Sequence, residues 1–134
     1  MLELETIPGV RVAGGPAALD GAVLGVGVLA LRFAPDELFS LSAEPHKVLD
    51  TNEVVDTNSE LIVVTESGFR GCWLTPDELS ARVLPHIDWA LPAARPVLVQ
   101  GFVAGVPAKL WLESSRVLLL CAAPYAHELA ERLG

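Results

Sequence analysis

Apolar runs with little regular polar alternation dominate this sequence, and several are rich in β-branched side chains. Three examples are residues 22–33, 60–65 and 97–103, each bounded by glycine, proline or short polar segments. β-Branched residues pack well on a pleated surface, so such runs predict strands. The same reasoning predicts a first strand or hairpin over residues 2–12 and further strands at residues 70–74, 108–113 and 116–121.

One short sequence occurs twice, as APDEL at residues 34–38 and TPDEL at residues 75–79. Proline suits the first helical position, and acidic residues in the first turn complement the helix dipole. Thr75 adds a side chain that can cap the second copy. The pattern therefore predicts a strand, a tight turn and a helix start at both places, with the second helix ending at Pro85.

A third and more degenerate copy leads from an apolar run into a C-terminal helix that opens at Pro124. Leu129 and Leu133 lie four residues apart, so they share one face of this predicted helix. Each copy closes a segment in which strands precede a helix, which indicates ββα-like repeats. The predicted units are residues 1–45, 46–91 and 92–134.

Strands joined by short turns favour an antiparallel sheet, because parallel strands need long crossover connections. The run over residues 97–121 predicts a three-strand meander, and residues 60–74 predict a hairpin. We therefore expect an α+β fold with a mostly antiparallel sheet of six to eight strands and two or three helices. A chain of 134 residues can form this as a single domain with one full core.

Seventeen acidic and nine basic residues give a net charge of −8, and the basic residues are scattered singly. Such a chain is repelled on average by phosphate backbones and anionic lipid, so neither nucleic acid nor membrane is expected as a partner. The N-terminal segment is acidic, unlike a signal peptide. The uncharged run at residues 21–31 is shorter than the roughly 20 residues that a spanning helix needs. A cytoplasmic protein is predicted.

A metal site would have to use the acidic segment around His46, Asp50 and Asp56. Residues from Asp56 onward begin like a calcium-binding loop, with oxygen donors at alternate positions. The match then fails, because Leu61 stands where the loop requires glycine and Ser67 stands where it requires glutamate. The sequence therefore predicts no metal and no cofactor.

No motif for a nucleophile or a phosphate-binding loop is present, and the three histidines lie in separate regions. Cys72 and Cys121 occur in apolar runs, so we expect buried, reduced thiols. Arg70 shares strand parity with Cys72 and could lower the pKa of that thiol. Catalytic residues stay unassigned, and the balance favours a protein that is not an enzyme.

The strands over residues 97–103 and 117–123 are apolar on both faces, and both faces must then be covered. A second subunit is a natural cover, so the first hypothesis is an interaction or assembly domain that forms a homodimer. Tryptophan and other large apolar residues are enriched at the centre of such interfaces. The candidate interface residues are Phe102, Leu110 and Trp111.

Two alternative functions remain open at this stage. The first is a regulatory module that binds a small ligand, with Arg70 pairing an anionic group and Trp73 forming an apolar wall. The second is a small enzyme whose active site lies at a subunit boundary and uses the acidic segment with His46.

Overall fold

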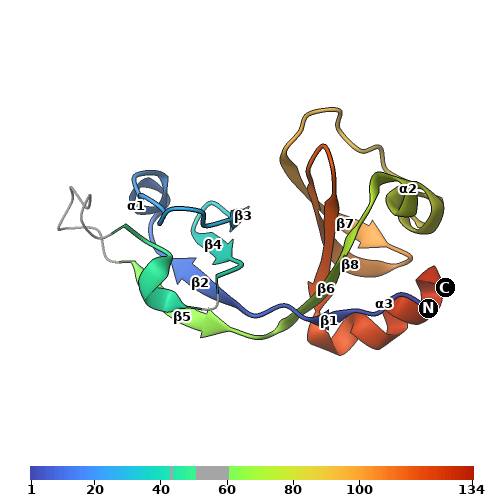
Figure 1. The fold of residues 1–134 in the computed structure, drawn as a ribbon, viewed down its shortest axis with the longest axis horizontal. Coiled ribbons are helices and arrows are strands. Elements are labelled where there is room, and N and C mark those ends of the chain that lie inside the picture. Colours follow the sequence, from blue (N-terminus) through green and yellow to red (C-terminus); the bar gives the residue numbers. More distant parts are fainter. Residues whose placement is uncertain (43, 51–60) are drawn as a thin grey trace. The chain divides into compact units, whose positions relative to one another are not determined.

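The computed structural model describes every residue except 43 and 51–60, and the chain forms two compact units (Figure 1). One unit, termed the terminal unit here, combines residues 1–7 with residues 68–134, and the other, termed the inserted unit, consists of residues 8–67. Each contains one antiparallel sheet. The α+β class with antiparallel strands is thereby confirmed, with nine strands and three helices among the described residues.

The terminal unit contains a five-stranded sheet in the order β1-β6-β9-β8-β7. Its last three strands form the meander that the sequence predicts. The turn between β7 and β8 has φ values of +50° at Ala104 and +78° at Gly105, the left-handed conformation of a tight hairpin. The strands are β1 (Glu5–Thr6), β6 (Phe69–Leu74), β7 (Val97–Val103), β8 (Val106–Leu112) and β9 (Val117–Ala122).

Both helical segments predicted for this unit are present. Helix α2 (Pro76–Glu78) begins at a complete capping box on Thr75, then continues through a π-helical turn and a 3-10 turn that ends at His86. A 3-10 turn leads into helix α3 (Ala126–Leu133), which buries one apolar stripe. These helices and one face of the sheet enclose the core, which includes Leu74, Leu79, Val83, Val103, Val106, Leu110, Leu112, Val117, Leu119, Leu129 and Leu133.

The inserted unit contains a four-stranded sheet in the order β3-β4-β2-β5. A short helix, α1 (Pro16–Asp20), and a 3-10 turn accompany the sheet. Its smaller core is formed by Val10, Val12, Leu19, Leu38 and Val48. The strands are β2 (Gly9–Ala13), β3 (Ala30–Ala34), β4 (Glu37–Ser40) and β5 (Ile62–Glu66).

The helix predicted from the first copy of the repeated sequence does not form. Pro35 and Asp36 make the turn of a β3–β4 hairpin instead. Ala34 has no hydroxyl group, so the N-cap that Thr75 supplies in the other copy is missing here. Glu37 lies where Glu78 completes the capping box, but its carboxylate pairs with Arg11 at 3.2 Å.

The strand predicted over residues 22–33 is also largely wrong, because only its last residues enter β3. The glycines explain the difference. A Cβ atom at Gly25 would lie 2.1 Å from the carbonyl oxygen of Lys47, so this position needs glycine for a close approach of the chain. Gly27 has a φ of +75°, which a regular strand does not accommodate. These residues therefore form turns and an isolated bridge between Leu24 and Leu49.

Two predicted hairpins are divided between the sheets. Strands β5 and β6, expected to pair with each other, belong to the four-stranded and the five-stranded sheet respectively. Strands β1 and β2 are separated in the same way. The two compact units therefore have boundaries at residues 7 and 67 rather than at the limits of the three predicted repeats.

Among the described residues, no helix has the length and apolar character needed to cross a membrane.

Candidate interaction surface

The five-stranded sheet has a second face, opposite the core, that is unusually rich in aromatic side chains. Residues directly opposite each other in neighbouring antiparallel strands share a face. The register therefore aligns Leu98, Trp111, Leu118 and Trp73 in one row across four strands. We call this side the aromatic face; its residues are Phe69, Gly71, Trp73, Leu98, Gln100, Phe102, Pro107, Lys109, Trp111, Leu118, Leu120 and Ala122.

A cluster of aromatic and charged groups occupies one end of the aromatic face. The guanidinium group of Arg116 lies 3.7 Å from the centre of the Trp73 ring. Its Nε donates a hydrogen bond of 2.7 Å to Oε1 of Glu113, and Nε1 of Trp111 donates one of 2.8 Å to Oε2. We call these four residues the Arg116 cluster. Both oxygens of the Glu113 carboxylate therefore accept a hydrogen bond, which ties the Trp111 ring and the guanidinium group over Trp73 to one another.

The hydrogen bond from Arg116 and then that from Trp111 lower the pKa of Glu113. Both bonds favour the ionised carboxylate, which keeps Glu113 negatively charged near neutral pH. The side chain of Arg116 is 50% exposed and that of Glu113 is 23% exposed. The Arg116 cluster thus presents a stacked guanidinium group and two half-buried tryptophan rings, the residue types that dominate binding interfaces.

A groove of about 360 Å³ occupies the other end of the aromatic face. Leu120, which is fully buried, lies at its base, and the rings of Phe69, Phe102 and Tyr125 line it. Phe102 is 63% exposed and Tyr125 is 44% exposed. The amine of Lys109 donates a hydrogen bond of 2.7 Å to the side-chain oxygen of Gln100, which adds a polar border to an otherwise apolar groove.

The three interface residues predicted from the sequence separate in the structure. Phe102 and Trp111 lie on the aromatic face, at the groove and in the Arg116 cluster respectively. Leu110 is only 1% exposed and lies in the core, because neighbouring residues of a strand point to opposite faces. Leu110 therefore supports the sheet from within and does not contribute to a surface patch.

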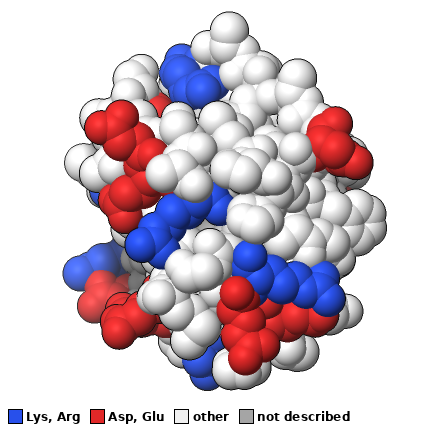
Figure 2. All heavy atoms as spheres, turned by 90° about the vertical axis from the view of Figure 1, so that its right-hand side faces the viewer, with Lys and Arg blue, Asp and Glu red and all other residues white. Residues whose placement is uncertain are grey.

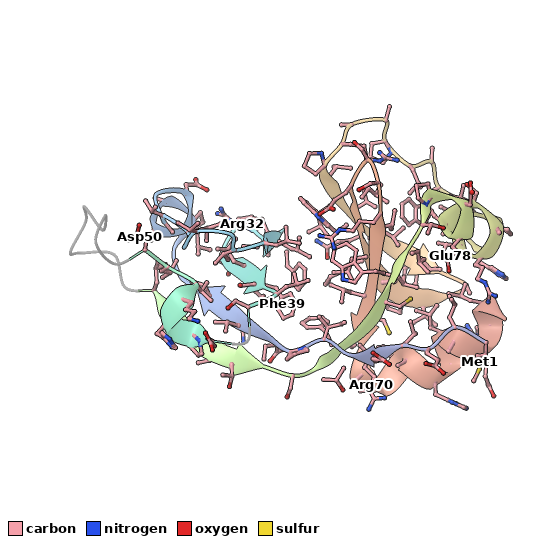
Figure 3. The ribbon with its side chains drawn as sticks, in the orientation of Figure 1. Met1, Arg32, Phe39, Asp50, Arg70 and Glu78 are labelled. Carbon is pink, nitrogen blue, oxygen red and sulfur yellow. The ribbon has the colours of Figure 1, made fainter. Side chains whose placement is uncertain are left out.

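Arg70 and Trp73, the predicted ligand-binding pair, also lie on opposite faces of the sheet. They are three residues apart on β6, an odd spacing that separates side chains across a strand. Arg70 lies opposite Cys121 in the register, and Figure 3 shows its side chain extending away from the ribbon. The cation that contacts Trp73 is Arg116 instead. One feature of the sequence pointed to Arg116, which directly follows the Ser114–Ser115 turn and begins a predicted strand.

The thiols are not activated. Burial raises the pKa of Cys72 to about 11, with smaller contributions from Glu78 and Cys121, so the predicted lowering by Arg70 is wrong. Burial also raises the pKa of Cys121, against a smaller opposing effect of Arg70. Both cysteines are free. They act as small apolar residues at the core, as expected from the sequence.

The acidic segment gives no metal-binding geometry in the part of the chain that the structure describes. No group of three histidine, cysteine or acidic side chains converges there. His46 lies exposed in a 3-10 turn, where neighbouring Lys47 pairs with Glu44 at 2.6 Å. Asp50 follows this turn, and Asp56 lies outside the described residues.

Comparisons with known proteins bear on the fold alone. A scan against protein-family models and a search of curated protein sequences find no match to the chain. Among solved structures, a chain of the heterotetrameric sarcosine oxidase from Corynebacterium sp. U-96, in complex with pyrrole 2-carboxylate, superposes with a TM-score of 0.70. The match covers 98% of this chain and 80% of that one, at 17% sequence identity. The two chains share a fold.

Proposed function

We propose that the protein is a cytoplasmic, non-catalytic assembly domain that forms a homodimer through the aromatic face of its terminal unit. The observation that carries the proposal is the combination of the Arg116 cluster with the exposed ring of Phe102 on one side of one sheet. Aromatic residues and arginine supply most of the binding energy in interfaces, where they lie in desolvated positions.

The charge of the terminal unit also suits self-association. Its residues include eight acidic and six basic side chains, for a net charge of −2, whereas the inserted unit has nine acidic and three basic side chains, for a net charge of −6. Figure 2 shows acidic and basic groups side by side on one face of the molecule. Two copies of a nearly neutral unit repel each other weakly, so apolar contacts can decide the association.

The fold neighbour supports an assembly role in general terms. It is described as a heterotetrameric enzyme, so a chain with this fold occurs there within an assembly of several subunits. The choice of a second copy as the partner rests on the aromatic face and on the low net charge of its unit.

The test is the absolute mass of the protein by light scattering across a dilution series. We expect a dimer for the wild type and a monomer for Phe102→Asp, which places a charge on the aromatic face. Val26→Asp is the matched control, because Val26 is fully exposed and belongs to the inserted unit. A monomeric wild type, or a Phe102→Asp variant that stays dimeric, would show that the aromatic face does not join two copies.

A further inference from the structure

An open sheet exposes a row of backbone N–H and C=O groups at each edge, and proteins usually protect these edges from other strands. The five-stranded sheet has a very short strand at one edge, because β1 has only two residues. At its other edge, contacts lie at the end of β7, where Nε1 of Trp89 donates a hydrogen bond of 2.9 Å to the carbonyl oxygen of Phe102. In the turn that follows, the N–H of Ala104 donates one of 2.8 Å to the carbonyl oxygen of His86.

The four-stranded sheet has an irregular strand at one edge, β3, and a regular strand at the other, β5. Strand β3 has an irregularity between Arg32 and Ala34, and the Arg32 side chain donates hydrogen bonds of 3.1 Å to the carbonyl of Ala34 and 2.5 Å to that of Pro35. Strand β5 has no bulge, proline or lysine. Among the described residues, no backbone hydrogen bond joins its outer edge to another segment.

The side chains of β5 are apolar at positions that solvent reaches. Ile62 is 63% exposed and Val64 is 44% exposed. In the register with β2, Ile62 lies opposite Ala13 and Val64 lies opposite Arg11. Val63 points to the other face of the sheet, where it packs against the core of the inserted unit. An exposed apolar edge of this kind is a template for the addition of another strand.

The charge of the inserted unit indicates which charge a strand added at β5 should carry. The unit has a net charge of −6, and β5 ends in the acidic Glu66. Arg11, on the neighbouring strand, is paired with Glu37. Within the described residues Glu66 forms no ion pair. A second copy would carry the same negative charge in its own inserted unit and be repelled, whereas a basic segment would be attracted to this unit.

We propose that β5 is a docking edge at which an extended, basic and apolar segment of a different protein adds as a fifth strand. Main-chain hydrogen bonds to β5 provide affinity, apolar side chains of the partner pack beside Ile62 and Val64, and its basic side chains pair with the acidic unit. This inference names the partner chemistry of the proposed assembly domain, but it uses a different unit and surface from the homodimer.

The test uses the full chain and two synthetic peptides, one alternating valine with lysine and one alternating valine with glutamate. Binding of a fluorescent label on each peptide is followed by anisotropy, and hydrogen exchange locates the contact. We expect saturable binding of the lysine peptide, protection of backbone amides in residues 62–66, and no binding of the glutamate peptide. Val64→Lys should weaken binding of the lysine peptide at least about tenfold, because it introduces charge into the edge.

Val26→Lys is the matched control, since it changes the net charge equally within the same unit at another exposed valine. We expect its affinity to stay within about twofold of the wild type. Equal weakening by both variants would reveal non-specific attraction and overturn the proposal, as would the absence of binding or of amide protection in residues 62–66. A dimer lost with Val64→Lys but kept with Phe102→Asp would show that a second copy occupies this edge. A dimer lost with Phe102→Asp but kept with Val64→Lys would support the proposal, because a second copy then does not use the β5 edge.

Discussion

The capping box at Thr75 provides the sharpest test of how this sequence determines its fold. Oγ1 of Thr75 accepts a hydrogen bond of 3.1 Å from the N–H of Glu78, and Oε1 of Glu78 accepts one of 3.1 Å from the N–H of Thr75. The turn that begins here places Leu79 and Val83 in the core. Thr75→Ala removes the bond to the hydroxyl group, and the bond from the N–H of residue 75 to Glu78 then stands alone.

The expected loss of stability is about 1 kcal/mol, the usual cost of replacing an N-cap threonine with alanine. The site is exposed, so water satisfies the freed N–H and the cost stays well below that of an unpaired buried donor. With a urea dependence of about 2 kcal/mol per M, the unfolding midpoint should fall by about 0.5 M. Thr75→Ser keeps the hydroxyl group and should retain most of the stability.

Tryptophan fluorescence is a suitable probe, because Trp73, Trp89 and Trp111 all belong to the terminal unit and report its unfolding. Equilibrium unfolding in urea is compared for the wild type, Thr75→Ala and Thr75→Ser. A change below about 0.3 kcal/mol for Thr75→Ala, or an equal loss for Thr75→Ser, would refute the role of the hydroxyl group as a cap.

Three further predictions concern other parts of the chain. Gly9→Ala would place a Cβ atom 2.4 Å from the buried ring of Phe39 (labelled in Figure 3), and we expect a loss of about 1–3 kcal/mol in urea unfolding followed by circular dichroism. Because the pKa of Cys72 is raised to about 11, we expect its alkylation by iodoacetamide at pH 8 to be at least about 100-fold slower than in the unfolded chain, measured by mass spectrometry; equal rates would contradict its burial. The lowered pKa of Glu113 stabilises the fold above the carboxyl pKa of the unfolded chain, and this contribution is lost as the pH falls through the folded value. Glu113→Gln should therefore be less stable than the wild type at pH 7. The two should be equally stable in acid, where Glu113 is protonated in both the folded and the unfolded chain, and a difference that persists there would contradict a stabilising role of the ionised carboxylate.

The repeated sequence shows which parts of the fold local chemistry could predict. The two copies differ at the first position, Ala34 or Thr75, and only the threonine can cap a helix. The prediction noted the capping threonine of the second copy, but it took the shared proline and acidic residues as sufficient for a helix at both copies. The meander over residues 97–122 was predicted closely, because its hairpins depend on neighbouring residues and short turns.

Pairings between distant segments could not be predicted in the same way. Strand β2 pairs with both β4 and β5, and β6 pairs with β1 and β9, so each lies beside strands remote in sequence. Alternation of apolar residues assigns a face to each strand but does not identify the neighbouring strand. The Arg116 cluster depends on such a pairing, since β9 brings Arg116 beside Trp73 of β6. Phe102 and Trp111 could be placed on one face because they share a hairpin.

The division of charge between the units connects the two proposed surfaces. Net charge calculated for the whole chain argues against nucleic acid and anionic membranes, but it hides the contrast between −2 and −6 in the two units. Salt should therefore separate the two associations. Contacts through the aromatic face are mainly apolar and should persist at 1 M salt, where the Debye length is about 3 Å, whereas capture of a basic strand at β5 should weaken strongly. If both associations responded equally to salt, the assignment of a nearly neutral, self-associating unit and an acidic unit that binds a different chain would lose its physical basis.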